Sequence, residues 1–216
     1  MRILLLSDIH DNEGMLERIL RAEEYDIIVI SGDFTYYRDL DYVVGVIERV
    51  SRFSDVYFVP GNCDPRGLLA TENIGEAKNL HLKIYDVGEF YIGGVGGSNI
   101  TPFDTRIEFT ERQIYEMLEI YRARREILDR LVLVTHVPPY GTLDKLASGV
   151  HVGSIELRRF VDEYSPLAVV SGHIHESLGI VEIGDTVIVN PGPVMYGRYA
   201  LMRISGGKID VSLRSV

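Results

Sequence analysis

The chain has 216 residues, and its 32 Asp and Glu side chains outnumber its 22 Lys and Arg side chains, so the formal net charge is −10. Hydrophobic residues make up 46% and charged residues 25%, which excludes a disordered or collagen-like chain and suits one domain, over residues 1–216, with a sizeable core. The acidic balance argues against broad electrostatic binding to nucleic acid, and no apolar run is long enough to span a bilayer.

Cys63 is the only cysteine, so the monomer has no disulfide, which is typical of a reducing compartment. The apolar start of the chain meets Asp8 after a few residues and is too short for the core of a signal peptide. We therefore expect a cytoplasmic protein with no membrane partner and no stable nucleic-acid partner. The sequence leaves the oligomeric state open.

Apolar runs alternate with helical patterns in the first part of the chain. Strands are predicted at residues 2–6, 25–30 and 56–59. A first helix follows Asp11 or Asn12, either of which can cap it, and a second helix covers residues 40–50. This βαβαβ order predicts a mostly parallel sheet covered by helices.

The middle of the chain is less regular. Short strands are predicted at residues 80–85 and 89–95. Four glycines within residues 93–97 then interrupt the pattern. Their spacing is not that of a dinucleotide-binding fingerprint, so we expect a tight bend close to other backbone. Thr110 to Gln113 has the spacing of a capping box and begins a helix that we expect to end near residue 128.

The last part of the chain changes from β/α units to a series of short strands. Strands are predicted at residues 131–135 and 167–170, with a helix at 154–164 between them. Four short strands follow, at residues 178–183, 186–189, 198–204 and 208–213. No linker separates the parts, so the sequence predicts one α/β domain.

Polar side chains follow directly after five of the predicted strands. They are two Asp, one Asn and four His: Asp8, His10, Asp33, Asn62, His136, His173 and His175. Because the carboxyl ends of parallel strands share one edge of a sheet, where ligands bind, we expect these seven side chains to meet there.

Carboxylate, amide and imidazole ligands together are typical of a catalytic metal site. Carboxylates suit Mg²⁺ and Mn²⁺, imidazole suits Mn, Fe, Co, Ni and Zn, and the lack of thiolate argues against structural zinc. Seven ligands are too many for one tetrahedral ion but suit two ions that share one carboxylate. Two ions about 3.5–4 Å apart can hold both the attacking and the leaving oxygen in a phosphoryl transfer.

Each of these residues also has a simpler interpretation when taken alone. Asp8 can cap the first helix, Asp33 can be a turn residue after a glycine, and His136 can be a hydrogen-bonded structural histidine. Four of the six histidines, however, directly follow predicted strands, and it is this joint pattern that favours a metal site.

Five short motifs resemble those of the calcineurin-like metallophosphoesterases in order and residue type. They are Asp8-x-His10, Gly32-Asp33, Gly61-Asn62-x-Asp64, His136 and Gly172-His173-x-His175. The resemblance extends from residue 8 to residue 175. It implies a two-sheet β-sandwich flanked by helices, an αββα architecture, which agrees with the predicted elements.

The resemblance also assigns roles to the seven side chains. It implies that Asp8, His10 and His175 hold one divalent ion, that Asn62, His136 and His173 hold the other, and that Asp33 bridges them. Mn²⁺ is the expected metal, with Ni, Fe, Zn, Co and Mg as alternatives. The implied reaction is direct attack of a metal-bridging hydroxide on phosphorus, with Asn62, His136 and Asp33 as catalytic residues.

Cys63 departs from the pattern of the family. Many members have a histidine at this position that is thought to protonate the leaving group, whereas a thiol is a weak hydrogen-bond donor. We expect Cys63 to be a small, partly buried residue without a catalytic task, and Asp64 to orient the loop rather than to bind metal. The cysteine form resembles small bacterial and archaeal members, some of which are phosphodiesterases. A small phosphoester is therefore the expected substrate, with diesters favoured.

Four further residues are candidates for substrate binding: Asn12, Arg66, Asn99 and His151. Arg66 can equally be a solvated loop charge, and His151 can equally be a residue near a helix cap. The 13 tyrosines are spread along the chain, and their spacing predicts no stacking platform.

Two other functions are compatible with this resemblance. A small protein of this fold can be a non-catalytic or weakly catalytic protein-binding scaffold, like the retromer subunit of similar fold, but all seven ligand positions are kept here. A DNA-repair nuclease usually needs additional DNA-binding parts, which a chain of 216 residues with a net charge of −10 does not supply.

Overall fold

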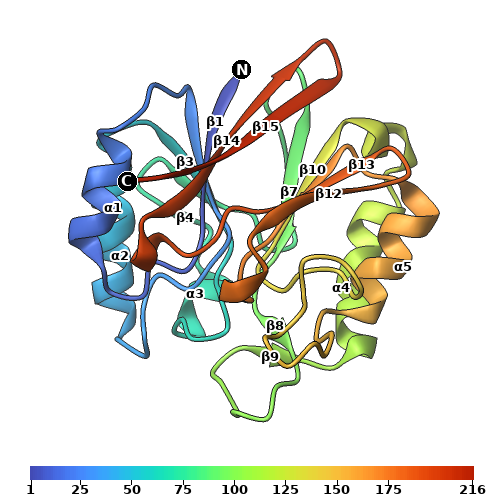
Figure 1. The fold of residues 1–216 in the computed structure, drawn as a ribbon, viewed down its shortest axis with the longest axis horizontal. Helices are drawn as coiled ribbons and strands as arrows, with labels where there is room; N and C mark the ends of the chain where they lie inside the picture. The colour runs from blue at the N-terminus through green and yellow to red at the C-terminus, as the bar shows by residue number, and fades with distance from the viewer.

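Two β-sheets lie face to face, and each carries helices on its outer surface (Figure 1). The computed structural model describes residues 1–216. In Figure 1 the helices of the first half of the chain cover one side of the molecule and those of the second half cover the other. This is the αββα sandwich that the sequence predicts.

The first sheet has seven strands in the order β15-β14-β1-β2-β3-β5-β4. Strands β1, β2, β3 and β5 are parallel, and β14, β15 and β4 are antiparallel to their neighbours. The strands are β1 (Arg2–Leu6), β2 (Ile27–Ile30), β3 (Asp55–Phe58), β4 (Asn73–Ile74), β5 (Ala77–Asn79), β14 (Arg198–Ser205) and β15 (Lys208–Ser215).

The second sheet has six strands in the order β12-β13-β11-β10-β7-β6, of which the central four are parallel. They are β6 (Ile84–Asp86), β7 (Tyr91–Val95), β10 (Leu131–Thr135), β11 (Ala168–Val170), β12 (Gly179–Ile183) and β13 (Thr186–Asn190). A separate pair consists of β8 (Ser98–Asn99) and β9 (Glu108–Phe109).

The helices form the two outer layers and short connections. They are α1 (Glu13–Leu20), α2 (Leu40–Val50), α3 (Gly67–Ala70), α4 (Glu111–Arg122) and α5 (Ile155–Tyr164), with 3₁₀ turns η1 (Arg125–Arg130), η2 (His175–Ser177) and η3 (Val194–Tyr196). No helix combines the length and the apolar composition needed to cross a bilayer.

Three apolar clusters hold the four layers together. A cluster of 20 buried residues joins α1 and α2 to the first sheet, one of 17 lies between the sheets, and one of 14 joins α4 and α5 to the second sheet. Strands β1, β2 and β10 are buried on both faces, which explains why their sequences are nearly continuous runs of Leu, Ile and Val.

The predicted caps of two helices are confirmed. The Asn12 side chain accepts a hydrogen bond from the Met15 amide and caps α1, and Thr110 and Gln113 form the capping box of α4. Each cap satisfies amides that the first helical turn leaves unpaired, which fixes where the helix begins.

Two predicted elements are wrong in extent. The helix expected to reach residue 128 ends at Arg122 because Arg124 leaves the helical region, with φ −118° and ψ 54°, and η1 follows. The strand expected at 80–85 is limited to β6 because Leu82 turns the chain with a φ of 55°.

The glycine run has two structural roles. Gly93 and Gly94 lie within β7, where a Cβ on Gly94 would be 2.5 Å from the Val134 carbonyl oxygen. The expected close approach to other backbone is thus confirmed for Gly94. The bend itself comes later, at Gly97, whose φ of +76° favours glycine.

We expect Tyr121→Phe to lower the free energy of unfolding by about 1 kcal/mol. The buried Tyr121 hydroxyl donates a hydrogen bond of 2.7 Å to the Gly94 carbonyl, and Phe would keep the ring but lose this bond. Urea denaturation measures the change. Tyr115→Phe is the control, because Tyr115 is exposed on α4 and makes no buried bond through its hydroxyl. Equal stability of the two variants would contradict the assignment.

The stability of the fold should also decrease as the pH falls from about 6.5 towards 4, in part through His81. Burial, with the nearby Lys83 charge, lowers the His81 pKa to about 4, and its Nδ1 accepts a hydrogen bond of 3.0 Å from the Gly96 amide. Because the folded state prefers the neutral ring, protonation favours the unfolded chain. Urea midpoints at pH 7.5 and 5.0 should fall less in His81→Gln than in the wild type; an identical decline would exclude His81 as a source.

Candidate metal centre

The structure brings the seven predicted ligand side chains together at one edge of the sandwich. They lie in the loops that follow β1, β2 and β3 of the first sheet and β10 and β11 of the second sheet. The site therefore spans both sheets.

Asp8, His10 and His175 form one group of potential ligand atoms. The Nε2 atoms of His10 and His175 are 3.2 Å apart. Asp8 Oδ1 is 3.3 Å from the His175 nitrogen and 3.8 Å from that of His10. One small cation could contact all three side chains.

His136 lies at the centre of a second group. Its Nε2 is 2.8 Å from Asn62 Oδ1 and 3.3 Å from Asp33 Oδ2. The His173 ring is next to it, with 5.0 Å between the ring centroids. The same Asp33 oxygen is 3.6 Å from His10 Nε2, so it lies within reach of both groups.

The polar atoms of this site fit a cation better than they fit one another. The buried Asp8 Oδ1 and His10 Nδ1 have no hydrogen-bond partner. His136 Nδ1 is 2.7 Å from the Ser31 carbonyl oxygen and must donate its proton there, so a neutral ring directs the Nε2 lone pair at two oxygens. Such a convergence of acceptors is stabilised only by a proton or a metal ion.

The pKa values of the site residues also indicate that the site fits a cation. Burial opposes a charged His136, yet the adjacent Asp33 raises the His136 pKa to about 9. Burial also opposes ionisation of Asp8, but neighbouring His175 and His136 hold the Asp8 pKa below its usual value. Burial, with the charge of His136, lowers the His173 pKa to about 4. The site thus keeps its carboxylates ionised and favours positive charge between them.

Four of the seven residues have a strained backbone. Asp8, His10, Asp33 and His173 have φ angles of 55°, 45°, 54° and 66°, in the left-handed region that non-glycine residues rarely adopt. Backbone hydrogen bonds between the loops hold two of them: the Asp8 amide donates to Gly32, and the His10 amide donates to Asp33. Strain of this kind is concentrated at functional sites.

Glycines of the motifs allow the loops to approach closely. A Cβ on Gly61 would be 2.1 Å from Asp33 Oδ1, one on Gly32 would be 2.7 Å from His136 Nδ1, and one on Gly172 would be 1.7 Å from Ser7 Oγ. Any side chain at these positions would displace a predicted ligand or its support.

The Asp64 and Cys63 positions agree with the sequence interpretation. Asp64 accepts hydrogen bonds from the amides of Gly61 and Thr35 and so orients the loop, as expected. The Cys63 amide donates to Asp33 Oδ1 at 2.8 Å, which leaves Oδ2 to face the histidines. Burial and the charge of Asp33 raise the pKa of the Cys63 thiol, so the thiol is neutral in this structure.

Sequence reasoning did not identify Thr105 and Glu108, which orient Asn62. The Asn62 Nδ2 donates a hydrogen bond of 2.9 Å to Thr105 Oγ1, and this hydroxyl donates one of 2.6 Å to Glu108 Oε1. The chain of bonds directs Asn62 Oδ1 towards His136. Nothing in the local sequence indicates this role, because Thr105 lies 43 residues from Asn62 in an irregular loop.

The four predicted substrate-binding residues make other contacts. Asn12 caps α1 and donates to the Met195 carbonyl, and Arg66 donates to the Arg106 carbonyl. Asn99 donates to the Val152 carbonyl. His151 Nδ1 is 2.6 Å from Asp144 Oδ1. None of the four is hydrogen-bonded to the seven ligand side chains.

Two exposed tyrosines border the Asp8, His10 and His175 group, although spacing along the chain predicts no stacking platform. The Tyr36 ring stacks on His10 with centroids 3.7 Å apart and an interplanar angle of 8°. The Tyr196 ring meets His175 edge to face, with centroids 6.4 Å apart. Tertiary structure, not spacing, brings them to the site.

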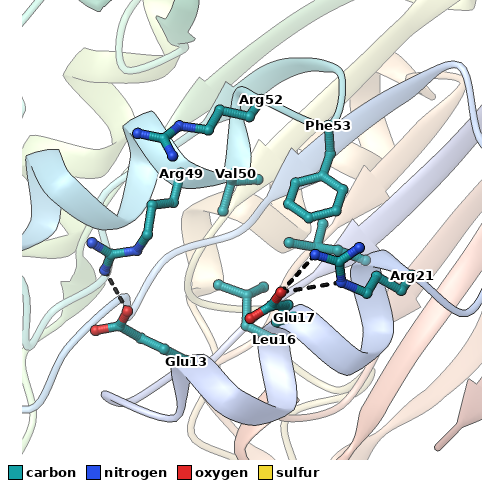
Figure 2. Close-up of a pocket in the computed structure, with 9 residues that line it drawn as sticks. Glu13, Leu16, Glu17, Arg21, Arg49, Val50, Arg52 and Phe53 are labelled. Carbon is teal, nitrogen blue, oxygen red and sulfur yellow. Dashed lines mark hydrogen bonds and ion pairs between the residues drawn. The ribbon is translucent and has the colours of Figure 1, made fainter.

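A cavity of about 330 Å³ lies elsewhere, between α1 and α2 (Figure 2). Ion pairs between Glu13 and Arg49 and between Glu17 and Arg21 cross or border it. None of the seven predicted ligands lines this cavity.

We expect Thr105→Val to weaken metal binding roughly tenfold, because loss of the hydroxyl frees the Asn62 amide to rotate. Isothermal titration with Mn²⁺ measures the affinity, and unfolding in urea checks that the fold is intact. Thr101→Val is the matched control: Thr101 also donates to Glu108 but makes no bond to Asn62. Unchanged metal affinity in Thr105→Val would show that the hydroxyl does not position Asn62.

Comparisons with known proteins agree with the fold and with the motifs. The family model described as calcineurin-like phosphoesterase matches residues 1–177, which include all seven side chains. The uncharacterized protein MJ1162 of Methanocaldococcus jannaschii is 32% identical over 207 residues, covering 92% of this chain and 91% of its own.

Solved structures share the architecture at lower identity. A dimetal phosphatase from Danio rerio has a TM-score of 0.68 at 13% identity, covering 100% of this chain and 96% of its own. A novel archaeal phosphodiesterase has a TM-score of 0.51 at 14% identity, covering 99% and 100%. These two show a common fold, and the family model, with its motifs all at one edge of the sandwich, shows that the chain belongs to the calcineurin-like phosphoesterase family.

Proposed function

We propose that residues 1–216 form one metallophosphoesterase domain that hydrolyses small phosphoesters with two divalent ions and favours diesters. In this proposal Asp8, His10 and His175 hold one ion, while Asn62, His136 and His173 hold the other. Asp33 bridges them. Mn²⁺ is the favoured metal, as the carboxylate, amide and imidazole ligands suit it.

One observation carries the dinuclear assignment. Asp33 Oδ2 is 3.6 Å from His10 Nε2 and 3.3 Å from His136 Nε2, which belong to the two proposed ligand groups. A single carboxylate oxygen between the two sets is the arrangement that a bridging ligand requires. The dimetal phosphatase from Danio rerio, with its similar fold, supports the same interpretation.

Two bound ions would supply an activated water and a positive field for the phosphoryl oxygens. Hydrogen bonds within this chain orient the side chains that would hold the ions. The Cys63 amide fixes one oxygen of Asp33, and the Ser31 carbonyl holds the proton of His136 on Nδ1. Thr105 fixes the amide of Asn62. These three ligands are thus oriented before substrate arrives, which avoids reorganisation during the reaction.

The resemblance of the Cys63 form to certain family members supports the preference for diesters, whereas the chemistry of the thiol bears on the leaving group. A neutral thiol is a poor proton donor, so esters whose leaving oxygen departs without a proton, such as aryl esters, are the best substrates. The cysteine form resembles phosphodiesterases of the family, and the novel archaeal phosphodiesterase has the same fold.

The net charge of −10 argues against stable nucleic-acid binding, and the unpaired Cys63 favours action in the cytoplasm.

The protein loaded with Mn²⁺ or Ni²⁺ should cleave a bis-aryl phosphodiester with a higher kcat/KM than the matching aryl monoester. Mg²⁺ and Zn²⁺ are compared in parallel, and chelation should abolish turnover. A tenfold preference for the monoester would overturn the diester assignment. Absence of both ion binding and turnover would instead favour a protein-binding scaffold.

Asp33→Asn should lower the metal content from about two ions per chain to one or fewer and reduce turnover by at least about 100-fold. The substitution keeps the shape of the side chain but removes the charge that would serve both ions. Elemental analysis and kinetics measure the two effects. Asp185→Asn, in the exposed turn between β12 and β13, is the matched control. Full metal content in Asp33→Asn would contradict the bridging role.

A further inference from the structure

Two exposed aromatic rings stand at the entrance to the metal centre. Tyr36 is 46% exposed and Tyr196 is 63% exposed, yet each contacts a histidine of the same ligand group. Those histidines, His10 and His175, have Nε2 atoms only 3.2 Å apart. The two tyrosines therefore flank one point of the site from different segments of the chain.

A contact of Tyr36 joins the two segments that carry the tyrosines. Tyr36 follows β2, whereas Tyr196 ends η3, just before β14. The Tyr36 hydroxyl lies 3.7 Å from the sulfur of Met195, and the Met195 carbonyl accepts a hydrogen bond from Asn12. His10 and Met195 thus hold the Tyr36 ring in place, which lowers the entropy lost when a ligand stacks against it.

A third tyrosine, Tyr37, interacts with the side chain of Cys63, which adjoins Asn62 in the chain. Tyr37 is 48% exposed and has a φ of 62°, a strained value for a bulky residue. Arg106 lies over its ring at 5.3 Å and donates hydrogen bonds to the carbonyls of Tyr37 and Arg38. These contacts hold the exposed Tyr37 ring next to the second ligand group, which contains Asn62.

We propose that Tyr36 and Tyr196 bind a planar aromatic group of the phosphoester, an aryl ring or a nucleobase, by stacking beside the phosphoryl group. The inference rests on the proposed phosphoesterase activity and specifies its substrate class. An aromatic ring that stacks on tyrosine is recognised through its π-face, so this surface accepts several ring chemistries. Aryl esters, whose leaving oxygen departs without a proton, are also those that a site without an acid histidine would be expected to handle best.

A merely structural role makes a different prediction. If Tyr36 only covers His10, its loss would weaken metal binding and would affect all phosphate ligands equally. If it stacks with the substrate, its loss would weaken only ligands that carry a ring. The decisive quantity is therefore the ratio of affinities for ring-bearing and ring-free phosphates in protein loaded with Mn²⁺.

Isothermal titration gives this ratio from binding heats rather than from turnover rates, and a phosphate-release assay of each titrated sample corrects for any hydrolysis of the probes. The probes are adenosine 5′-monophosphate, phenyl phosphate, methyl phosphate and inorganic phosphate. In the wild type we expect the two ring-bearing probes to bind about tenfold more tightly than methyl phosphate. Tyr36→Leu and Tyr196→Leu should each bring the ratio towards one, whereas Tyr36→Phe should keep it. Tyr115→Leu is the matched control, because Tyr115 is also 46% exposed but lies on α4.

The outcomes separate the two proposals. A ratio near one in the wild type, or an unchanged ratio in both Leu variants, overturns the stacking role while phosphate binding leaves the phosphoesterase proposal intact. Failure of every probe to bind overturns both. Preference for adenosine 5′-monophosphate over phenyl phosphate would identify a nucleobase as the source of the ring, and equal affinity would identify any planar ring.

Discussion

Two buried carboxylates dominate this structure. Asp8 and Asp33 are 1% and 3% exposed at the same edge of the sandwich, where like charges repel and water cannot screen them. Positive charge inside the site must therefore balance the two carboxylates. The surrounding histidines can supply it when protonated, and the arrangement of the polar atoms also fits a cation. The strained φ angles and the close glycines follow from the same constraint, because they place the carboxylates where five loops converge.

The two sheets depend on each other through this edge. Asp33 and Asn62 come from the first sheet, and their partner His136 comes from the second. The 17 buried residues between the sheets form a closely packed core. This packing fixes the distance between side chains that come from different sheets. The helices on the outer faces contain none of the seven polar side chains.

The sequence predicted the layers and the convergence of the seven polar side chains at one edge, because both depend on local signals. Continuous apolar runs mark strands buried on both faces, and polar residues directly after them mark the edge. It failed where the backbone turns without a sequence signal and where distant parts of the chain come together. Leu82 and Arg124 end elements through their backbone angles, and Thr105, Tyr36 and Tyr196 reach the site only through tertiary folding.

The pairing of β1 with β14 has a consequence for folding. β1 is central in its sheet, yet one of its two neighbours is a strand that begins at Arg198, with Arg2 paired to Arg203. During synthesis β1 and β2 can pair early, but the other edge of β1 stays open until β14, which begins at Arg198, has left the ribosome. Long-range pairing of this kind is slow, and the exposed edge of a strand as apolar as β1 can meanwhile join another chain. Protection of this edge in the nascent chain is therefore a requirement of the fold itself.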